Sequence, residues 1–410
     1  MPDVSVLNVA LYGKVIATLT RVAGDRSLFA FTDDYIGDLQ RPTLGLFFKD
    51  QFGALRTDFP PVQTKILPFL SNLLPEGHLR RYLAERAGVH PEREFFLLWA
   101  LGQDLSGAVT VTPADGEAWP PDAMAPRGEK PAPQDNRLRF SLAGVQLKFS
   151  AVASARGGLT VPASGIGGDW IVKLPSRDYA GVPENEYSMM RLASLLGMDV
   201  PKVDLIDIDS ISGLPETTRR FGNKAFVIER FDRLPGGGRV HIEDFAQVFG
   251  VYGTDKYKTA SLRSIAKVLA AEGTDADIRE FIRRLTFNTL IGNGDMHLKN
   301  WSLIYRDQRT ASLAPAYDFV STIPYIPGDR FALAYSRTKE FSGFDEDELS
   351  HLAAKAALPR KMVLDTAREM AADFRAVWER EKGHLPMLGE VREAIDALLP
   401  TLPIVGGAGG

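Results

Sequence analysis

One stretch decides the fold class of this chain: GNGDMHLKN at Gly292–Asn300, followed downstream by YDF at Tyr317–Phe319. Asp295 precedes Asn300 by five residues, and a second carboxylate, Asp318, follows after a short interval. Phosphoryl transfer from ATP uses an aspartate that accepts the proton of the attacking hydroxyl, and an asparagine and an aspartate that hold magnesium. The spacing therefore predicts an ATP and Mg²⁺ site with Asp295 as the catalytic base and with Asn300 and Asp318 as metal ligands.

The flanking residues predict how this motif is held. Apolar residues recur at a helical period over 278–290, and two glycines follow. Residues 301–305 are typical of a strand, and 313–314 can pair back with them as a hairpin. This order places the base on a loop after a helix and the metal ligands at the two ends of the hairpin. The aspartate–asparagine spacing is common by itself, and its alternative interpretation is a polar loop that caps a helix.

The composition is that of an ordinary globular protein with two or three domains: 410 residues, 45% hydrophobic, 24% charged, and a net charge of -4. The absence of cysteine excludes a disulfide framework, a thiolate metal site and a cysteine nucleophile. The N-terminus lacks the pattern of a signal peptide, and no stretch approaches the roughly 18 apolar residues of a membrane span. We expect a cytoplasmic enzyme that has no membrane partner and does not bind DNA over its whole surface.

The first region, 1–112, looks rich in strands and then helical. A hairpin is predicted around Tyr12–Gly13, and further strands at Leu28–Phe31 and Leu44–Phe48. Helical patterns occupy 63–102 in two segments. We interpret this region as an N-terminal subdomain.

The second region follows a segment rich in proline, alanine and charge, 113–136, which reads as a linker or exposed loop. A domain spanning 137–400 then shows strand patterns over about 137–235 and mostly helices over about 236–400. Strands first and helices later, with the Asp295 motif in the helical part, predict an α+β, two-lobed protein-kinase-like fold. Its β-rich part would hold the nucleotide, and its helical lobe would supply the catalytic loop.

A lysine inside an apolar strand gives the predicted site a cation. Lys173 ends the run WIVK, and Glu186 follows thirteen residues later in a helix whose buried side includes Met189. An unpaired buried ammonium is costly, and Glu186 lies one turn before Met189 on the same side. We expect a Lys173–Glu186 pair that points the lysine toward ATP phosphates. The alternatives are a surface lysine with a glutamate favoured by the helix dipole, and Glu184 in place of Glu186.

Two other segments occupy positions that a kinase uses for nucleotide binding. The strand at 225–231 runs into charged residues where a kinase has its hinge, so backbone groups of Glu229 and Phe231 are candidates to bind adenine. The alternative is a strand end with a surface salt bridge. Residues 141–148 lie where a phosphate-covering loop belongs, but with one glycine the pattern alone indicates a turn.

Six blocks in this order resemble the HipA family, the serine/threonine kinase toxins of HipBA-type toxin–antitoxin modules. The blocks are SLAGVQLK at 141–148, WIVK at 170–173, ENEY at 184–187, ERFDR at 229–233, GNGDMHLKN at 292–300 and APAYD at 314–318. The amino-terminal region adds NLLPEG at 72–77, so the resemblance spans nearly the whole chain.

The resemblance implies roles for single residues. Lys173, with Glu186, is implied to bind ATP phosphates, and the loop that covers them is implied to bind ATP through Ala143, Gly144, Val145, Gln146 and Lys148. Ser141 matches an autophosphorylation site that switches the kinase off. A phosphate adds about two negative charges to a loop that must embrace ATP, so its ejection is physically reasonable.

His297 and Lys299 lie between the candidate base and Asn300. His297 could orient Asp295 or touch phosphate, but the favoured interpretation is that it braces the loop through a backbone carbonyl. Lys299 could neutralise the charge of the transferred phosphoryl group, or it could be a solvated loop lysine.

The resemblance implies a growth-arresting, persistence-associated toxin kinase that phosphorylates a serine or threonine of a cellular protein, an aminoacyl-tRNA synthetase being the implied kind of target. A HipB-like DNA-binding antitoxin is the implied partner, and DNA would be reached only through it. One alternative is a small-molecule kinase of the aminoglycoside or choline type, which often carries a histidine where this chain has Asn293. Another is a non-catalytic co-repressor, which the intact Asp295, Asn300 and Asp318 disfavour.

Overall fold

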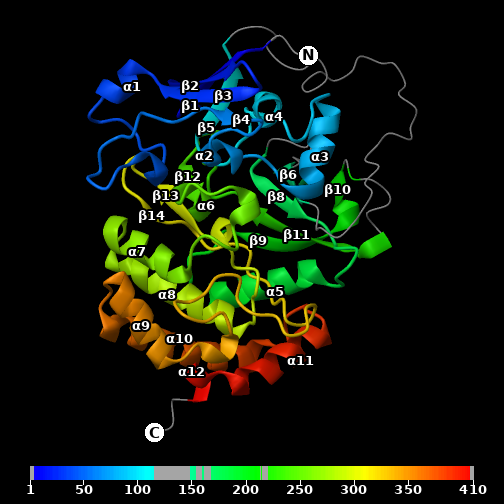
Figure 1. Ribbon diagram of the computed structural model, residues 1–410. Coiled ribbons are helices and arrows are strands. Elements are labelled where there is room, and N and C mark those ends of the chain that lie inside the picture. The colour runs from blue at the N-terminus through cyan, green and yellow to red at the C-terminus, as the bar shows by residue number, and fades with distance from the viewer. Residues whose placement is uncertain are drawn as a thin grey trace.

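The computed structural model describes residues 4–114, 148–153, 159–160, 168–212, 214 and 220–406 (Figure 1). Within these ranges the chain forms an N-terminal sheet, a second sheet, and a small third sheet that joins a helical lobe. The N-terminal sheet lies at one end of the molecule and the C-terminal helices lie at the other (Figure 1). This is the predicted mixed α+β arrangement, with strands before helices. Most of the predicted linker lies outside the described residues, so the domain boundaries stay a prediction.

The N-terminal domain is an antiparallel sheet in the order β4-β3-β2-β1-β5, with helices packed against it. Its strands are β1 (Val6–Leu11), β2 (Lys14–Val22), β3 (Arg26–Phe31), β4 (Val62–Gln63) and β5 (Val109–Pro113), and its helices are α1 (Asp33–Gly37), α2 (Pro68–Ser71), α3 (Gly77–Arg86) and α4 (Glu94–Leu101). The predicted hairpin at Tyr12–Gly13 is confirmed, and both turn residues have positive φ, 51° and 79°.

The strand predicted at Leu44–Phe48 is wrong. The segment ends in a 3₁₀ turn, Leu46–Phe48, and lies at the junction with the second domain. Gly45 fits there because it has no side chain: a Cβ would lie 2.5 Å from the ring of Phe69 and 2.7 Å from Glu243. A short apolar run at a domain junction looks like a strand in sequence.

The second sheet has the order β10-β7-β6-β8-β11-β9 and carries α5 (Val182–Leu195) on one face. Its strands are β6 (Lys148–Ala153), β7 (Leu159–Thr160), β8 (Trp170–Lys173), β9 (Val203–Asp207), β10 (Ile211–Ser212) and β11 (Lys224–Glu229). Side chains of β11 alternate between two cores. Phe226 and Ile228 pack with α5 and the helical lobe, whereas Ala225 and Val227 pack on the opposite face.

The helical lobe holds the largest core of the described residues and wraps a three-stranded sheet, β12-β13-β14. The elements are β12 (His241–Asp244), α6 (Phe245–Val248), α7 (Leu262–Glu272), α8 (Asp275–Leu290), β13 (Ser302–Tyr305), β14 (Ser312–Leu313), α9 (Glu346–Ala356), α10 (Arg360–Glu381), α11 (Gly389–Leu398) and α12 (Pro403–Gly406). The predicted helix before the motif and the hairpin after it are confirmed as α8 and β13–β14. Between them lies Gly292–Asn300, which we call the catalytic loop after its predicted role and which ends in a 3₁₀ turn at Leu298–Asn300.

Buried polar contacts join the N-terminal domain to β12 and β13. His241 is fully buried, and its Nε2 lies 2.7 Å from the carbonyl oxygen of Leu44. Glu243 Oε1 accepts hydrogen bonds from the Leu46 N–H, over 2.9 Å, and from the Tyr305 hydroxyl. Because His241, Glu243 and Tyr305 are buried, these hydrogen bonds form a dry polar contact between the two domains. Among the described residues, no helix has the length and apolar character needed to cross a bilayer.

Candidate active site

Side chains hold the catalytic loop where it leaves α8. Gly292 takes a left-handed φ of 63°, and a Cβ there would lie 2.6 Å from the side chain of Ile323. Asn293 is fully buried: its Nδ2 donates to Asn288 Oδ1 over 2.8 Å, and its Oδ1 accepts from the N–H of Asp295 over 3.1 Å. The asparagine that stands in place of a small-molecule kinase histidine therefore fixes the backbone of the candidate base.

Asp295 is exposed on this loop and shares a hydrogen bond with a residue that sequence reasoning missed. The hydroxyl of Tyr257, on the loop between α6 and α7, donates to Asp295 Oδ1 over 2.8 Å. Partial loss of hydration raises the pKa of Asp295, while the Tyr257 bond and the charge of Lys256 pull it the other way. The carboxylate oxygen Oδ1 of Asp295 therefore already accepts one hydrogen bond. Nothing in the local pattern around Tyr257 marks it as a site residue.

The two candidate metal ligands are both tied to the catalytic loop. Asn300 donates from Nδ2 to the carbonyl oxygen of Asp295 over 2.8 Å, which turns its amide oxygen away from that carbonyl. The carbonyl oxygen of Asp318 accepts from Asn293 Nδ2 over 3.3 Å. Asp318 itself has a φ of 59°, uncommon for a residue other than glycine and often found at functional sites. An amide oxygen and a carboxylate are donors that suit Mg²⁺, so the pair fits that ion.

Lys173 forms the predicted ion pair and has a second partner. Its Nζ donates to Glu186 Oε1 over 2.5 Å and also to Asp318 Oδ1. Only 10% of the Lys173 side chain and 3% of the Glu186 side chain are exposed. Burial alone would lower the pKa of Lys173, but the charges of Asp318 and Glu186 outweigh it and raise the pKa. The structure thus pairs Lys173 with Glu186 rather than Glu184, and we call Lys173, Glu186 and Asp318 the Lys173 cluster.

The candidate hinge residues lie at the end of β11. Glu229 is exposed, and its N–H donates to the carbonyl oxygen of Lys202 over 2.9 Å, so that N–H is already bonded. The ring of Phe231 lies 5.9 Å from the ring of Tyr317, the residue before Asp318. The structure thus places Phe231 near Tyr317 and leaves the Glu229 N–H already bonded, while adenine binding by this segment stays a prediction.

The charged residues of the same segment face the N-terminal domain. Arg230 and Arg233 contact Asp104 over 3.2 and 3.0 Å, and both also pair with Asp232. Asp232 in turn accepts from the N–H of Gly107 over 2.8 Å. The salt bridges that were the alternative interpretation therefore exist, but they are buried between domains rather than on the surface.

The structure shows what His297 and Lys299 contact, and the predicted roles of both side chains stay predictions. His297 Nδ1 is buried without a hydrogen-bond partner among the described residues, and the ring packs edge-on against Tyr257 at 5.0 Å. Burial, with the nearby charge of Lys256, lowers the pKa of His297 to about 3, so the ring is neutral at physiological pH. Lys299 Nζ binds Glu76 Oε1 over 2.7 Å and the carbonyl oxygen of Asn72 over 3.1 Å.

The residues predicted to cover the phosphates are mostly beyond the described part of the chain. Ser141, Ala143, Gly144, Val145 and Gln146 lie outside the described residues. Lys148 is the first residue of β6, and its backbone is paired with that of Lys173 in the adjacent strand. The end of the predicted covering segment therefore lies beside the strand that carries the phosphate-site lysine.

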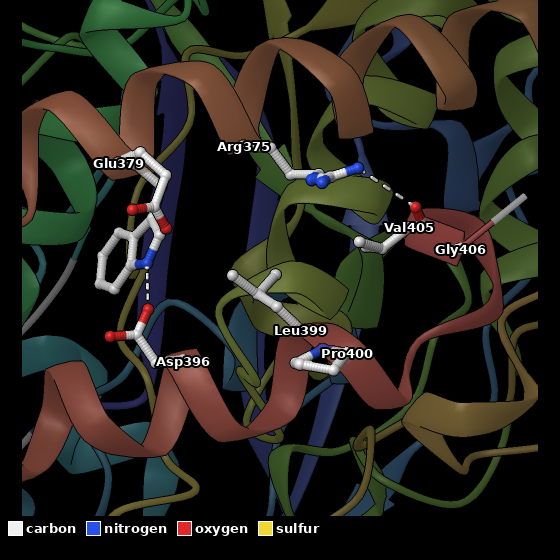
Figure 2. Close-up of a pocket in the computed structure, with 8 residues that line it drawn as sticks. Arg375, Glu379, Asp396, Leu399, Pro400, Val405 and Gly406 are labelled. Carbon is white, nitrogen blue, oxygen red and sulfur yellow. Dashed lines mark hydrogen bonds between the residues drawn. The ribbon is translucent and has the colours of Figure 1, made fainter. Parts of the chain in front are cut away.

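A hollow of about 630 Å³ lies elsewhere, between α10 and the C-terminal segment (Figure 2). Arg375 donates to the carbonyl oxygen of Val405 across it over 3.5 Å, and the Trp378 indole donates to Asp396 over 2.8 Å. Its lining residues come only from α10, α11 and the residues after α11. Because none of them belongs to the catalytic loop or the Lys173 cluster, we do not assign nucleotide binding to this hollow.

This architecture defines a class of protein, the two-lobed kinase fold with a candidate phosphoryl-transfer loop. Residues 7–112 match the HipA N-terminal domain model, and residues 140–378 match the HipA-like C-terminal domain model. The chain belongs to the HipA family.

Curated relatives and a solved structure agree with this membership. The chain is 58% identical over 98% of both chains to Y4dM of Sinorhizobium fredii, which is named as a candidate kinase. It is 29% identical, over 75% of both chains, to the serine/threonine-protein kinase toxin HipA of Shewanella oneidensis. Its fold is similar to a chain of the solved complex of HipA, HipB and operator DNA from Shewanella oneidensis, with a TM-score of 0.71 at 24% identity, covering 98% of this chain and 96% of that one.

Proposed function

We propose that this protein is an ATP-dependent protein serine/threonine kinase that uses Asp295 as the base, Asn300 and Asp318 as Mg²⁺ ligands and Lys173 as the phosphate-binding cation. The Lys173 cluster is the observation that carries this proposal. Lys173 is largely buried between Glu186 of α5 and Asp318, and these two carboxylates keep it charged. A charged lysine in such a place is suited to bind phosphate oxygens. The metal, when bound, supplies further neutralisation of the phosphate charge.

The proposed roles fall on two sides of the site, one that binds the nucleotide and one that activates the substrate hydroxyl. Lys173 would hold the phosphate end of the nucleotide, while Glu186 keeps the lysine from turning away. Asp295 would accept the proton of the substrate hydroxyl as that oxygen attacks the terminal phosphorus atom, while the bond from this phosphorus to the bridging oxygen breaks and ADP leaves. Asn293 fixes the backbone on which Asp295 stands. At the end of β11, Phe231 and the carbonyl oxygen of Glu229 would border the adenine. The N–H of Glu229 would not, because it is already bonded.

We further propose that Ser141 is an autophosphorylation site that switches the kinase off. The residues that would cover the phosphates, from Ala143 to Lys148, follow it directly. Phosphopeptide mass spectrometry after incubation with MgATP should find the modification at Ser141, and Ser141→Ala should remain active for longer. If wild-type protein with bound ATP carries no phosphate at Ser141, this regulation is wrong.

The proposed biological role is that of a growth-arresting toxin in the cytoplasm, restrained by a HipB-like DNA-binding antitoxin. The similar solved structure contains HipB and operator DNA, which supports a partner of that kind and contact with DNA through it. A cellular protein, of which an aminoacyl-tRNA synthetase is the first to test, would be the substrate. Asp295→Ala should remove both phosphotransfer and toxicity while retaining antitoxin binding. Toxicity that persists in this variant would contradict the kinase mechanism.

A further inference from the structure

We infer that Glu76, a residue of the N-terminal domain, is a positioning residue for the catalytic loop of the second domain. This inference rests on the proposed function, because it assigns Glu76 a part in phosphoryl transfer. Glu76 is the N-cap residue of α3. Its carboxylate bridges two lysines of the other domain, with Lys256 Nζ at 2.8 Å and Lys299 Nζ at 2.7 Å. We call these three residues the Glu76 cluster.

Each lysine of the Glu76 cluster directly precedes a residue that holds Asp295. Lys256 precedes Tyr257, whose hydroxyl donates to the Asp295 carboxylate over 2.8 Å. Lys299 precedes Asn300, whose amide donates to the Asp295 carbonyl oxygen over 2.8 Å. The Glu76 carboxylate thus holds the lysine before Tyr257 and the lysine before Asn300. We infer that it restrains the backbone at both residues that donate to Asp295.

Backbone contacts around Glu76 show that the two domains fit closely here. Asn72 donates from Nδ2 to the carbonyl oxygen of Val251 over 2.7 Å, and its own carbonyl oxygen accepts from Lys299 over 3.1 Å. The loop at Gly253 also passes close to Glu76, because a Cβ placed on this glycine would lie 2.6 Å from Glu76 Oε1. The Glu76 cluster therefore lies beside two further hydrogen bonds that join the two domains.

The electrostatics of the Glu76 cluster favour a fixed geometry. Burial opposes ionisation of Glu76, but Lys299 and Lys256 outweigh it and lower the pKa of Glu76 to about 2. Without this carboxylate, two ammonium groups would face each other and repel. The side chain of Glu76 is 42% exposed, and ion pairs with such exposure add little to global stability. Loss of Glu76 should therefore disturb the loop more than the fold.

This contact also changes the interpretation of Lys299. The ammonium is held by Glu76 and Asn72, both in the N-terminal domain, instead of being free for phosphate or solvent. The N-terminal domain therefore helps to build the active site without supplying a reacting group.

The test compares Glu76 with a matched ion pair that also joins the two domains. Lys49 and Glu272 are 2.9 Å apart, with side chains 31% and 33% exposed, and Glu272 lies in α7. In the full-length protein, Glu76→Ala should lower the single-turnover rate constant of autophosphorylation with MgATP about tenfold, because small misplacements of a base are costly. Glu76→Lys should lower it further, and Glu272→Ala should change it less than about twofold.

Amide hydrogen exchange provides a readout that does not depend on activity. Glu76→Ala should speed exchange in residues 293–300 about tenfold, whereas Glu272→Ala should not. Glu76→Gln, which keeps the shape of the side chain but not its charge, should lie between wild type and Glu76→Ala and covers the case in which Glu76→Ala does not fold. Unchanged exchange and an unchanged rate in these Glu76 variants would overturn the inference. An inactive wild type would instead overturn the proposed function, and the exchange result would still decide the role of Glu76.

Discussion

Two ion clusters flank the candidate active site, and they are opposite in composition and differ in the exposure of their central residue. The Lys173 cluster sets one lysine between two acids and is nearly dry, with 10% of the lysine side chain exposed. The Glu76 cluster sets one acid between two lysines, and 42% of the acid is exposed. Charges taken out of water interact strongly and leave a large penalty when one partner is lost, while exposed ones do not. We therefore assign ligand binding to the Lys173 cluster and loop positioning to the Glu76 cluster.

The largest difference between the two clusters should appear when the central residue of the dry one is removed. Lys173→Met leaves Glu186 and Asp318 without their shared cation, and breaking a buried pair in this way costs about 3–5 kcal/mol. We expect a lower thermal midpoint and a loss of phosphotransfer on the order of 10³-fold, measured by ³²P transfer from ATP. Lys49→Met, at the partly exposed pair with Glu272, is the control and should change both values little. Equal effects of the two substitutions would refute the contrast between dry and exposed clusters.

A buried acid that bonds to no lysine within the described part of the chain sharpens the comparison. Glu243 is fully buried at the domain junction, and its burial raises its pKa to about 8 despite the bonds from Tyr305 and Leu46. The folded protein then holds a proton that the unfolded chain releases. Stability from Glu243 is fully present below pH 4.5, the ordinary value, and is lost as the pH rises toward about 8.

Thermal unfolding at pH 5.5 and pH 8.5 measures this loss. Wild type should lose on the order of 2 kcal/mol more stability than Glu243→Gln between these two values, because glutamine cannot ionise. Glu272→Gln, which alters a partly exposed acid, is the control and should follow wild type. If Glu243→Gln and wild type keep the same pH dependence, the carboxyl group does not titrate in this range.

The smallest effect is expected at Tyr257, which connects the Glu76 cluster to the base. Tyr257→Phe removes one hydrogen bond to Asp295, worth about 1 kcal/mol, and should lower the phosphotransfer rate about fivefold if the phenol orients the carboxylate. Tyr252→Phe, which alters a phenol bonded to Ile66 at the domain junction, is the control. A faster Tyr257→Phe enzyme would mean that the phenol obstructs the base instead.

Sequence reasoning reached the parts of the site that are encoded locally. The helix before the catalytic loop, the hairpin after it and the Lys173–Glu186 pair follow from periodicity and from short spacing, and the structure contains all of them. A helix stripe shows which side faces inward, so a carboxylate on that stripe could be matched to a lysine thirteen residues before it.

Contacts between distant segments could not be derived in this way. Asp318 reaches Lys173 across 145 positions, and Lys299 reaches Glu76 across 223. Tyr257 sits in an irregular loop, where no period indicates which way a side chain points. The strand prediction for Leu44–Phe48 was wrong for a related reason. Burial at a domain junction gives the same run of apolar residues in the sequence as burial in a sheet.

The central claim is that Asp295 acts as the base of an ATP-dependent phosphotransfer supported by the Lys173 cluster. Its most direct test is a single-turnover assay of purified wild type and Asp295→Asn with radiolabelled ATP and Mg²⁺, with ATP binding measured on the same samples. We predict transfer by wild type, and a rate at least about 10²-fold lower in Asp295→Asn with ATP affinity retained. Equal transfer by the two proteins would contradict the claim.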